Sequence, residues 1–395
     1  MFRLAYFVSH PIQYQAPLLR LIAADLEIEL KVFFYSDFSL KPYQDSGFNR
    51  VIQWDIPLID GYKYQFLKTW TIGKKKLSLQ QSIAKDIKNQ LSNGKYDAIW
   101  VHGWSMICGI QAILAAEQLG IPILMRGESN NLNKSNNKIK NKVKRIYLEW
   151  LFKKISGFLY IGTLNHRFYK DYGIEEDRLF SMPYAVDNDY YQNQAELVSN
   201  NRAKLKLSLN LNPNRPIILY AAKIYDVKRP QDLLAAYKLL SLDGVSEPEP
   251  YLLFVGDGSL RSEIERQAQE MNWHSILFLG FRNQLEMPAI YDLCDIFVLP
   301  SGFEPWGLAI NEAMNMGKAL VVSDQVGCSL DLIVEGVNGK IFPVADIEEL
   351  AEALRWAVNH SNSAGKASLN LIQKFNYQED IKGLKQALNY LKTSK

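Results

Sequence analysis

The strongest constraint on the fold is a regular alternation of short apolar runs and helical patterns along the whole chain. The apolar runs are four to eight residues long, and helical patterns occupy the gaps between them, for example at 105–119, 231–240, 259–270 and 347–359. Such alternation is typical of parallel sheets with helices on both faces, so we expect an α/β fold. The expected strands lie at 3–8, 28–35, 97–102, 121–125, 157–161, 216–222, 251–255, 276–279, 295–299 and 319–322.

The expected strands form two series, and a stretch rich in Asn, Gln, Asp and Ser separates them at 187–214. A chain of 395 residues suits two domains of about 150–200 residues each. We place the interdomain connection around 185–195. The predicted parts are an N-terminal domain at 1–190, a linker region at 191–214, a C-terminal domain at 215–377 and a final helix at 378–395.

Composition points to a cytoplasmic protein with two ample cores. Hydrophobic residues make up 48% of the chain and charged residues 22%. No apolar run reaches the roughly 18 residues of a membrane span, and the short apolar start before Ser9 reads as a first core strand rather than a signal peptide. The three cysteines, Cys108, Cys294 and Cys328, are far apart, which suits buried thiols in a reducing compartment and excludes a cysteine metal site.

The most informative segment for function is 300–317, which reads PSGFEPWGLAINEAMNMG. Glu304 lies in a turn and Glu312 inside a short helix that should end at Gly317. The helical rise puts the two carboxylates on the order of 10 Å apart. Between them, the first-turn amides at 307–309 form an anion site. A ligand with hydroxyls at both ends and a diphosphate between them, a nucleotide-sugar, fits this spacing, although two solvated glutamates would also have it.

The residues around this pair resemble the retaining glycosyltransferases of family 4, which have the GT-B fold. That family carries S-x-x-E-x-x-G-x-x-x-x-E-A-M-x-x-G, and the resemblance is strong over roughly 215–345 and patchier before it. It implies two Rossmann-like domains facing a central cleft, with the final helix often crossing back to the first domain. The matching residues are Ser301, Glu304, Gly307, Glu312, Ala313, Met314 and Gly317.

The resemblance implies a role for each part of the donor site. Glu304 would meet the sugar, Glu312 the ribose, and the amides of Gly307, Leu308 and Ala309 the diphosphate. The nucleobase would meet backbone atoms where a strand ends. The residues at that strand end are Gly280, Phe281 and Arg282.

Two lysines follow the first strand of the second domain, in AAKIYDVKRPQDLLAAY. The family has a G-R-L…K pattern here, whose basic residues grip the diphosphate, and the matching positions are Lys223 and Lys228. Lysine in place of arginine keeps the charge but loses the two-pronged contact. The resemblance implies that these lysines stabilise the leaving diphosphate in place of a metal, so we expect neither metal nor cofactor. Arg229 is a weaker candidate.

Polar residues also end strands of the first domain, where open parallel sheets bind ligands. His102 ends the run at 97–102; a histidine there can be ordinary packing, but family members often place one beside the donor sugar or acceptor. His10 follows the first strand, in a loop without the family's glycine pair. We assign Arg126 and Glu128, which follow the run at 121–125, to acceptor contacts.

Two further patterns carry less weight. Asp187-Asn188-Asp189 matches the D-x-D of metal-dependent transferases, but it lies in the expected linker without the expected preceding strand. Gly256-Asp257-Gly258 follows a strand, but Arg261 replaces the third glycine of a dinucleotide fingerprint. We interpret it as a tight turn near the nucleotide.

A basic amphipathic helix is expected at 134–154, with apolar residues Ile139, Val143, Ile146, Tyr147 and Trp150 at helical spacing. One interpretation packs this apolar stripe on the core; another places the helix on anionic lipid. Nucleic acid is not expected, because no nucleic-acid motif accompanies the charge. The basic residues are Lys134, Lys138, Lys140, Lys142, Lys144, Arg145, Lys153 and Lys154, against the single acid Glu149.

These observations predict a retaining glycosyltransferase that moves a sugar from a nucleotide-sugar to a glycan or lipid-linked acceptor hydroxyl. The expected setting is cell-surface glycan, such as lipopolysaccharide or exopolysaccharide, or glycolipid biosynthesis in the cytoplasm, with peripheral attachment to the inner membrane face left open. The alternatives are a nucleotide-sugar epimerase, a phosphorylase, for which no pyridoxal phosphate lysine stands out, and a non-catalytic sugar-nucleotide or membrane-binding module.

Overall fold

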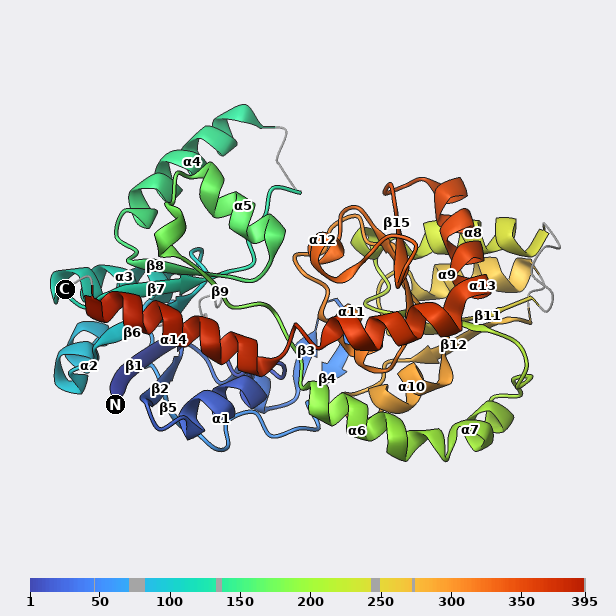
Figure 1. Cartoon of the computed structure of the whole chain (residues 1–395), viewed down its shortest axis with the longest axis horizontal. Coiled ribbons are helices and arrows are strands. Elements are labelled where there is room, and N and C mark those ends of the chain that lie inside the picture. Colours follow the sequence, from blue (N-terminus) through green and yellow to red (C-terminus); the bar gives the residue numbers. More distant parts are fainter. Residues whose placement is uncertain (46, 71–81, 133–136, 243–248, 272–273, 394–395) are drawn as a thin grey trace. The chain divides into compact units, whose positions relative to one another are not determined.

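The chain forms two compact units, each built around its own parallel sheet (Figure 1). Unit 1 comprises Met1–Tyr43, Ile56–Tyr184 and Tyr377–Lys395, and unit 2 comprises Gln44–Asp55 and Ala185–Asn376. A short early segment, Gln44–Asp55, therefore belongs to the second unit. The computed structural model describes residues 1–45, 47–70, 82–132, 137–242, 249–271 and 274–393.

Unit 1 contains a seven-stranded parallel sheet in the order β5-β2-β1-β6-β7-β8-β9. Its five central strands are those that the apolar runs predict. The two edge strands were not predicted, because β5 reads KYQF and is half exposed, while β9 is only three residues long. The strands are β1 (Phe2–Val8), β2 (Ile28–Phe34), β5 (Lys63–Phe66), β6 (Ala98–His102), β7 (Ile123–Arg126), β8 (Gly157–Tyr160) and β9 (Leu179–Ser181).

Helices cover both faces of this sheet. The last helix, α14, lies directly on β9, since a Cβ at Gly383 would be 1.6 Å from the carbonyl oxygen of Ser181. Aromatic side chains such as Phe7, Phe33 and Phe158 fill the core. The helices are α1 (Ala16–Ala24), α2 (Ile87–Gly94), α3 (Ile107–Gln118), α4 (Lys138–Phe152), α5 (Thr163–Asp171) and α14 (Tyr377–Thr393), with short 3-10 helices at Phe38–Leu40 and Glu176–Arg178.

Unit 2 contains a six-stranded parallel sheet in the order β12-β11-β10-β13-β14-β15. Its central strands are continuously apolar because helices bury both of their faces. A separate two-stranded sheet, β3-β4, lies at the early segment. The strands are β3 (Tyr43–Asp45), β4 (Arg50–Ile52), β10 (Ile217–Ala221), β11 (Tyr251–Val255), β12 (Ile276–Gly280), β13 (Ile296–Leu299), β14 (Ala319–Ser323) and β15 (Gly339–Phe342).

The helices of unit 2 include one that is twice as long as its pattern predicts. Helix α13 continues past 359 through a polar stretch, where a Cβ at Gly365 would lie 2.1 Å from the carbonyl oxygen of Gly317. The second half of α13 therefore packs closely against the backbone at Gly317, a tertiary contact that the local sequence pattern does not indicate. The helices are α6 (Asn188–Ser199), α7 (Arg202–Ser208), η4 (Asp226–Lys228), α8 (Pro230–Leu242), α9 (Arg261–Glu270), α10 (Met287–Leu293), α11 (Leu308–Asn315), α12 (Ser329–Leu332) and α13 (Ile347–Ile372).

The polar stretch at 187–214 is largely helical and includes α6 and α7. Asp187 begins α6 as its N-cap, since its carboxylate accepts a hydrogen bond of 2.9 Å from the N–H of Tyr190. The D-x-D pattern is thus the start of a helix in this structure.

Helix α4 turns a different face to the core than the apolar stripe predicts. Leu148, Leu151 and Phe152 are buried, whereas the stripe is largely outside. The interpretation that packs the whole stripe on the core is therefore wrong, and only Tyr147 of the stripe packs against it. The exposed fractions are 77% for Ile139, 62% for Val143, 59% for Ile146 and 44% for Trp150.

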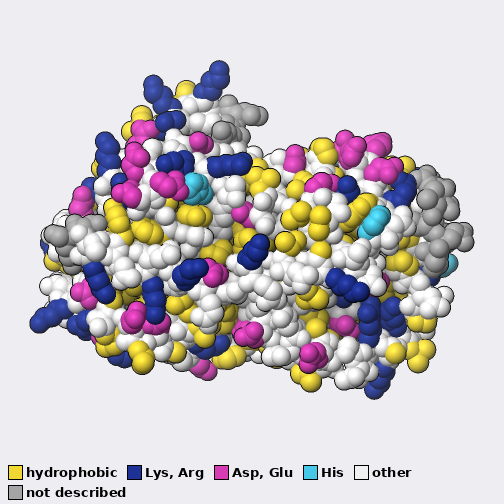
Figure 2. Space-filling model, in the orientation of Figure 1, with side chains coloured by type: hydrophobic (Ala, Val, Ile, Leu, Met, Phe, Trp, Pro, Cys, Tyr) yellow, Lys and Arg dark blue, Asp and Glu magenta, His cyan; other side chains and the backbone are white. Residues whose placement is uncertain are grey.

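Lys and Arg side chains gather in Figure 2 over the region that α4 occupies in Figure 1. Within the described ranges, no helix has both the length and the apolar character needed to cross a membrane.

Candidate active site

The loop between β13 and α11 holds Glu304 through its backbone. The N–H of Glu304 donates to the carbonyl of Gln325 (3.0 Å), and the carbonyl of Glu304 accepts from the N–H of Gly327 (2.9 Å). A Cβ at Gly327 would lie 1.8 Å from the carbonyl oxygen of Pro305, so this contact requires glycine. The position of Glu304 is therefore set by the fold before any ligand binds.

Helix α11 begins immediately after this loop. Gly307 precedes it with φ +105°, a conformation that glycine adopts readily. The indole N–H of buried Trp306 donates to Oδ1 of Asn311 (2.9 Å) and ties the loop to the helix. Leu308 and Ala309 form the first helical turn, as the sequence predicts, and the diphosphate contact expected of their amides stays a prediction.

Glu304 forms an ion pair with Lys228 through Oε2 and Nζ. Lys228 ends the short helix η4, and the N–H of Gly302 donates to the carbonyl of Val227 (2.7 Å), which joins the two loops. The side chains of Lys228 and Glu304 are 12% and 19% exposed, so the pair is sheltered but reachable from solvent. The structure thus brings together two predicted catalytic residues that are far apart in sequence.

Lys223 lies just after β10 and pairs with a residue that the sequence did not single out. Its Nζ is 2.9 Å from Oδ1 and 3.2 Å from Oδ2 of Asp45, in the early segment of unit 2. Burial of Asp45 opposes ionisation, but the N–H of Phe48 and the Lys223 ammonium together hold the pKa of Asp45 below its usual value. Asp45 is therefore a carboxylate at neutral pH.

Glu312 lies in the middle of α11 within a polar cluster. Its Oε2 accepts from the hydroxyl of Tyr291 (2.7 Å), and Nε2 of Gln284 lies 3.4 Å from Oε1. Gln284 also donates to the hydroxyl of Tyr191 (2.6 Å). Burial raises the pKa of Glu312, and these hydrogen bonds oppose that rise. The cluster supplies hydroxyl and amide groups suited to a polar ligand, and the ribose contact of Glu312 stays a prediction.

The turn after β12 holds the predicted nucleobase contacts. Gly280 has φ +70°. The ring of Phe281 packs edge-on against Phe48, with centroids 4.9 Å apart, and the guanidinium carbon of Arg50 lies 4.9 Å from its centroid. Arg282 pairs with Glu286 at 3.0 Å. Phe48 and Arg50 again come from the early segment, which sequence reasoning missed because only short three-residue strands mark it.

The turn at 256–258 packs against the loop that carries Lys223. A Cβ at Gly256 would lie 2.0 Å from the carbonyl oxygen of Ala222, and one at Gly258 would lie 2.4 Å from that of Ile224. These glycines therefore allow two backbone segments to touch. The interpretation as a tight turn agrees with this geometry.

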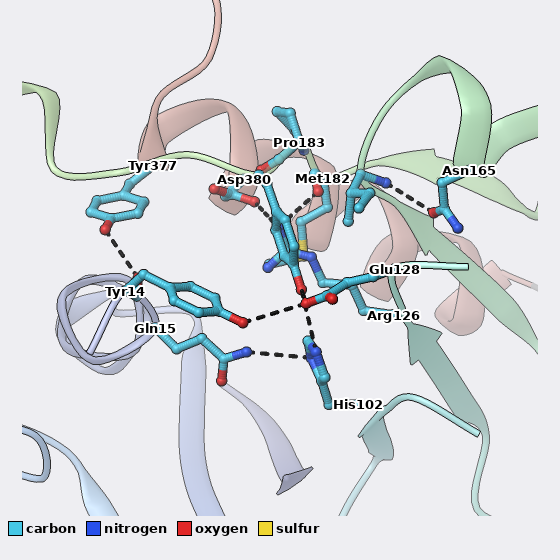
Figure 3. Close-up of polar contacts among 12 residues, drawn as sticks. Tyr14, Gln15, His102, Arg126, Glu128, Asn165, Met182, Pro183, Tyr377 and Asp380 are labelled. Atoms are coloured by element: carbon cyan, nitrogen blue, oxygen red, sulfur yellow. Dashed lines mark hydrogen bonds and ion pairs between the residues drawn. The ribbon is translucent and has the colours of Figure 1, made fainter. Parts of the chain in front are cut away.

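Unit 1 has its own polar cluster at the end of β6 (Figure 3). Nδ1 of His102 lies 3.5 Å from Nε2 of Gln15, as Figure 3 shows, and 3.1 Å from the Tyr6 hydroxyl, while Nε2 of His102 lies 3.4 Å from the Tyr184 hydroxyl. Burial, with the positive charge of Arg126 acting in the same direction, lowers the pKa of His102 to about 3. His102 is therefore neutral at pH 7.

Glu128 contacts one of the tyrosines that contact this histidine. Oε1 of Glu128 accepts from the hydroxyls of Tyr184 (2.5 Å) and Tyr14 (3.4 Å) (Figure 3). The Tyr6 hydroxyl in turn donates to Oε1 of Gln15 (3.0 Å), so each tyrosine beside His102 has its single hydroxyl hydrogen on another acceptor. The cluster thus places a carboxylate and a neutral imidazole around one tyrosine.

Arg126 is buried, with its side chain only 2% exposed. Its guanidinium donates to Asp380 on α14 (2.8 Å) and to the carbonyls of Met182 (2.9 Å) and Pro183 (3.0 Å) (Figure 3). Burial raises the pKa of Asp380 to about 7, and Arg126 opposes that rise. These contacts join α14 to the sheet, so the structure gives Arg126 a structural role, and an acceptor contact stays a prediction.

His10 lies in the loop after β1. Its Nδ1 is 2.9 Å from the Ser9 hydroxyl, and its ring contacts Phe38 with centroids 4.3 Å apart. Burial lowers the pKa of His10 to about 4. Like His102, it is a neutral polar group at pH 7.

Metal ligands do not cluster in the part of the chain that the structure describes, where no group of three or more His, Cys, Asp and Glu could hold an ion. Metal independence remains a prediction that activity measurements must test.

The two parallel-sheet units, and the ion pair of Lys228 and Glu304 in unit 2, agree with the GT-B fold that the sequence resemblance implies. A family model described as "Glycosyl transferases group 1" matches residues 201–374. Together with the relatives below, this match shows that the chain is a glycosyltransferase with the GT-B fold.

Among curated proteins, the chain is similar to the Escherichia coli UDP-Gal:alpha-D-GlcNAc-diphosphoundecaprenol alpha-1,3-galactosyltransferase. The two are 25% identical over 331 residues, which cover 80% of this chain and 81% of that protein. The sulfoquinovosyl transferase of Arabidopsis thaliana is 28% identical over 181 residues, which cover 44% of this chain and 33% of that protein.

Solved structures show the same fold over the whole chain. The Anabaena protein Alr3699/HepE in complex with UDP matches with a TM-score of 0.72 and 17% identity, covering 98% of this chain and 100% of that one. The apo lipopolysaccharide outer core galactosyltransferase WaaB matches with a TM-score of 0.67 and 16% identity, covering all of both chains.

Proposed function

We propose that this chain transfers a sugar from a UDP-sugar to a hydroxyl of a lipid-linked glycan, with retention at the anomeric carbon. The observation that carries the proposal is the meeting of Lys228 with Glu304 beside the start of α11, where the sequence places the donor diphosphate and sugar. UDP is named for the Anabaena structure, and a UDP-sugar and a lipid-linked acceptor for the Escherichia coli relative, which supports this choice.

Different residues of unit 2 bind different parts of the donor. Lys223 and Lys228 bind the diphosphate oxygens, Glu304 accepts hydrogen bonds from the sugar hydroxyls, and Glu312 accepts them from the ribose. The turn at 280–282 contacts the base. A positive charge placed at the diphosphate stabilises the charge that develops as the bond to the sugar breaks.

Unit 1 supplies the acceptor contacts. His102, neutral and hydrogen-bonded, and Glu128, which already accepts two tyrosine hydroxyls, are suited to hold an uncharged hydroxyl. His10 is a further neutral group for this role. No carboxylate is assigned as a covalent nucleophile.

The transfer then proceeds on one face of the sugar. The bond between the anomeric carbon and the diphosphate oxygen breaks, and its electron pair leaves with the nucleoside diphosphate. The acceptor oxygen bonds to the anomeric carbon from the same face, and its proton passes to the departing phosphate oxygen. Retention follows because attack and departure share one face.

The test begins with thermal stabilisation by UDP-, GDP- and ADP-sugars, because a ligand that binds only the folded state raises the melting temperature. The best donor is then incubated with a polyprenyl-diphosphate-linked sugar, and NMR coupling constants give the anomeric configuration of the product. We expect stabilisation by UDP-sugars and a retained configuration. An inverted product would refute retention, and donor conversion without acceptor would indicate an epimerase.

The exposed face of α4 supports a second part of the proposal, peripheral binding to an anionic membrane. Ile139, Val143, Ile146 and Trp150 form an exposed apolar stripe, and lysines flank it on the same helix. Such a helix lies in a lipid interface with its apolar side inserted. Each lysine near an anionic surface adds about 1 kcal/mol, which salt screens. A lipid-linked acceptor would be reached from that surface.

Vesicle co-sedimentation tests this binding. We expect recovery with phosphatidylglycerol vesicles at low salt, and less with phosphatidylcholine or at high salt. Replacing Ile139 and Val143 by Ser should reduce recovery, whereas replacing Leu197 and Leu207, which are exposed on unit 2, should not. Equal recovery with both lipids for all variants would rule out this role of α4.

A further inference from the structure

The early segment of unit 2, residues 44–55, contacts both loops that the proposed donor site uses. It reaches Lys223 after β10 at one end and residues 281–285 after β12 at the other. It is separated from the rest of unit 2 by more than a hundred residues of sequence, yet it packs with that unit. None of the proposed donor or acceptor contacts is made by a residue of this segment.

Its first half surrounds the Lys223 ammonium. Oδ1 of Asp45 accepts from the N–H of Gly47 (2.8 Å), from the N–H of Phe48 (2.9 Å) and from Nζ of Lys223 (2.9 Å). The Lys223 stem lies against Gly47, where a Cβ would be 2.6 Å from its Cδ, and Nζ lies 4.8 Å from the centroid of the Phe48 ring. Asp45 and Phe48 thus hold the charge that a diphosphate would need.

The second half of the segment is attached elsewhere. Nδ2 of Asn283 donates to the carbonyl of Gln53 (2.7 Å), and the N–H of Leu285 donates to Oδ2 of Asp55 (3.2 Å). Arg50 lies over the ring of Phe281. These contacts involve neither Lys223 nor Asp45, so they do not depend on the ion pair between those two side chains.

A carboxylate and a diphosphate cannot share one ammonium without repulsion between them. The Lys223 and Asp45 side chains are 33% and 17% exposed, so the pair is open to an incoming anion. A diphosphate carries more charge and more acceptor oxygens than a carboxylate, and Lys228 adds a second cation for it. Lys223 therefore binds the diphosphate in preference to the Asp45 carboxylate when both are available.

We propose that Asp45 is a built-in counter-anion of the donor site, which occupies Lys223 in the free protein and is displaced by the donor diphosphate. This inference rests on the proposed function. The Asp45 carboxylate leaves Lys223 on binding, while Arg50, Gln53 and Asp55 stay attached beside the base-contacting turn. Asp45 thereby neutralises an empty cationic site and sets the affinity for diphosphates, because every diphosphate must first break the Asp45 contact.

The test compares Asp45→Asn with the wild-type protein and with Asp55→Asn. Asparagine keeps an oxygen for the N–H groups of Gly47 and Phe48 but removes the charge that holds Lys223. Asp55→Asn removes a charge from the same segment away from Lys223. Binding of UDP and of inorganic pyrophosphate is measured by titration calorimetry. We expect Asp45→Asn to bind both ligands roughly two- to fivefold more tightly, the range of a partly exposed ion pair, and Asp55→Asn to bind as the wild type does.

A second pair of variants tests the route through Lys223. In a Lys223→Met background, Asp45→Asn should no longer change UDP affinity, because the exchange has lost its cation. Unchanged or weaker binding by Asp45→Asn in the normal background would overturn the exchange and make Asp45 a residue that orients Lys223. If neither ligand bound the wild type or Asp45→Asn, the proposed function itself would fall, and the exchange with it.

Discussion

The candidate groups of the two units differ in how their charge is handled. In unit 2, Lys223 and Lys228 are paired with carboxylates in partly open loops. In unit 1, His102 is neutral and bonded to tyrosines, and the nearby ion pair of Arg126 and Asp380 is closed off at 2% and 1% exposure. An incoming anion can replace the carboxylates that pair with Lys223 and Lys228, whereas Arg126 and Asp380 are too deeply buried to exchange partners with a ligand. The lysine pairs of unit 2 therefore fit the anionic donor that we propose, and the neutral His102 cluster fits the uncharged hydroxyl of the proposed acceptor.

The largest expected effect tests whether the Arg126 pair is structural. Arg126→Met leaves Asp380 buried without its partner, and breaking a buried pair from one side costs about 3–5 kcal/mol of unfolding free energy. Lys382→Met is the matched control, because its pair with Glu379 is exposed and should contribute less than about 1 kcal/mol. Urea denaturation followed by tryptophan fluorescence measures both. Equal small losses would mean that Arg126 does not hold α14 to the sheet.

The next effect concerns the open pair of unit 2. Glu304→Gln removes a charged hydrogen-bond acceptor, which is worth roughly 1.5–3 kcal/mol, or about ten- to a hundredfold, and we expect the loss in turnover rather than in stability. Glu352→Gln, on an exposed part of α13 and paired with Arg355, should leave turnover unchanged. A Glu304→Gln enzyme with normal turnover and donor affinity would remove Glu304 from the site.

A smaller effect tests the neutral state of His102. Its ordinary pKa of 6.5 falls to about 3 in the folded protein, so between these values the unfolded chain binds a proton that the folded chain does not. The unfolding free energy should therefore fall as the pH drops from about 6.5 towards 3. His102→Gln should flatten that slope, and His360→Gln on α13 should not. An imidazole NMR titration with a midpoint near 6.5 for His102 would contradict the buried neutral state.

The sequence predicts the long apolar elements of both units better than their short edge strands. The central strands of both sheets are long apolar runs and were found, as was the helix from Leu308 that follows Glu304. The edge strands β5, β9 and β15 are not predicted, because each has only three or four residues and none is a continuous apolar run. The face of α4 was misjudged because Leu148 and Leu151, as well as Ile139 and its partners, recur at helical spacing.

Within the site, residues that share a motif were easier to predict than residues that meet through the fold. The pairing of Lys228 with Glu304 joins two motifs that the family resemblance had already marked. Asp45 carries no motif, and its contact with Lys223 spans 178 positions. Such a contact depends on the packing of residues 44–55 with the rest of unit 2, which no local sequence pattern predicts.

The smallest expected effect is none at all, and it tests why unit 2 holds its charges in this way. If Lys223 and Lys228 neutralise the leaving diphosphate, the reaction needs no divalent ion, and turnover should be unchanged by excess EDTA. Asp187 of the D-x-D pattern is not expected to bind a metal ion, because its carboxylate caps the N-terminus of α6. Loss of activity with EDTA and recovery with manganese or magnesium would contradict this prediction. Lys223 and Lys228 would then act together with a metal ion, and the contrast between these lysines and the neutral His102 cluster would no longer explain how the leaving diphosphate is stabilised.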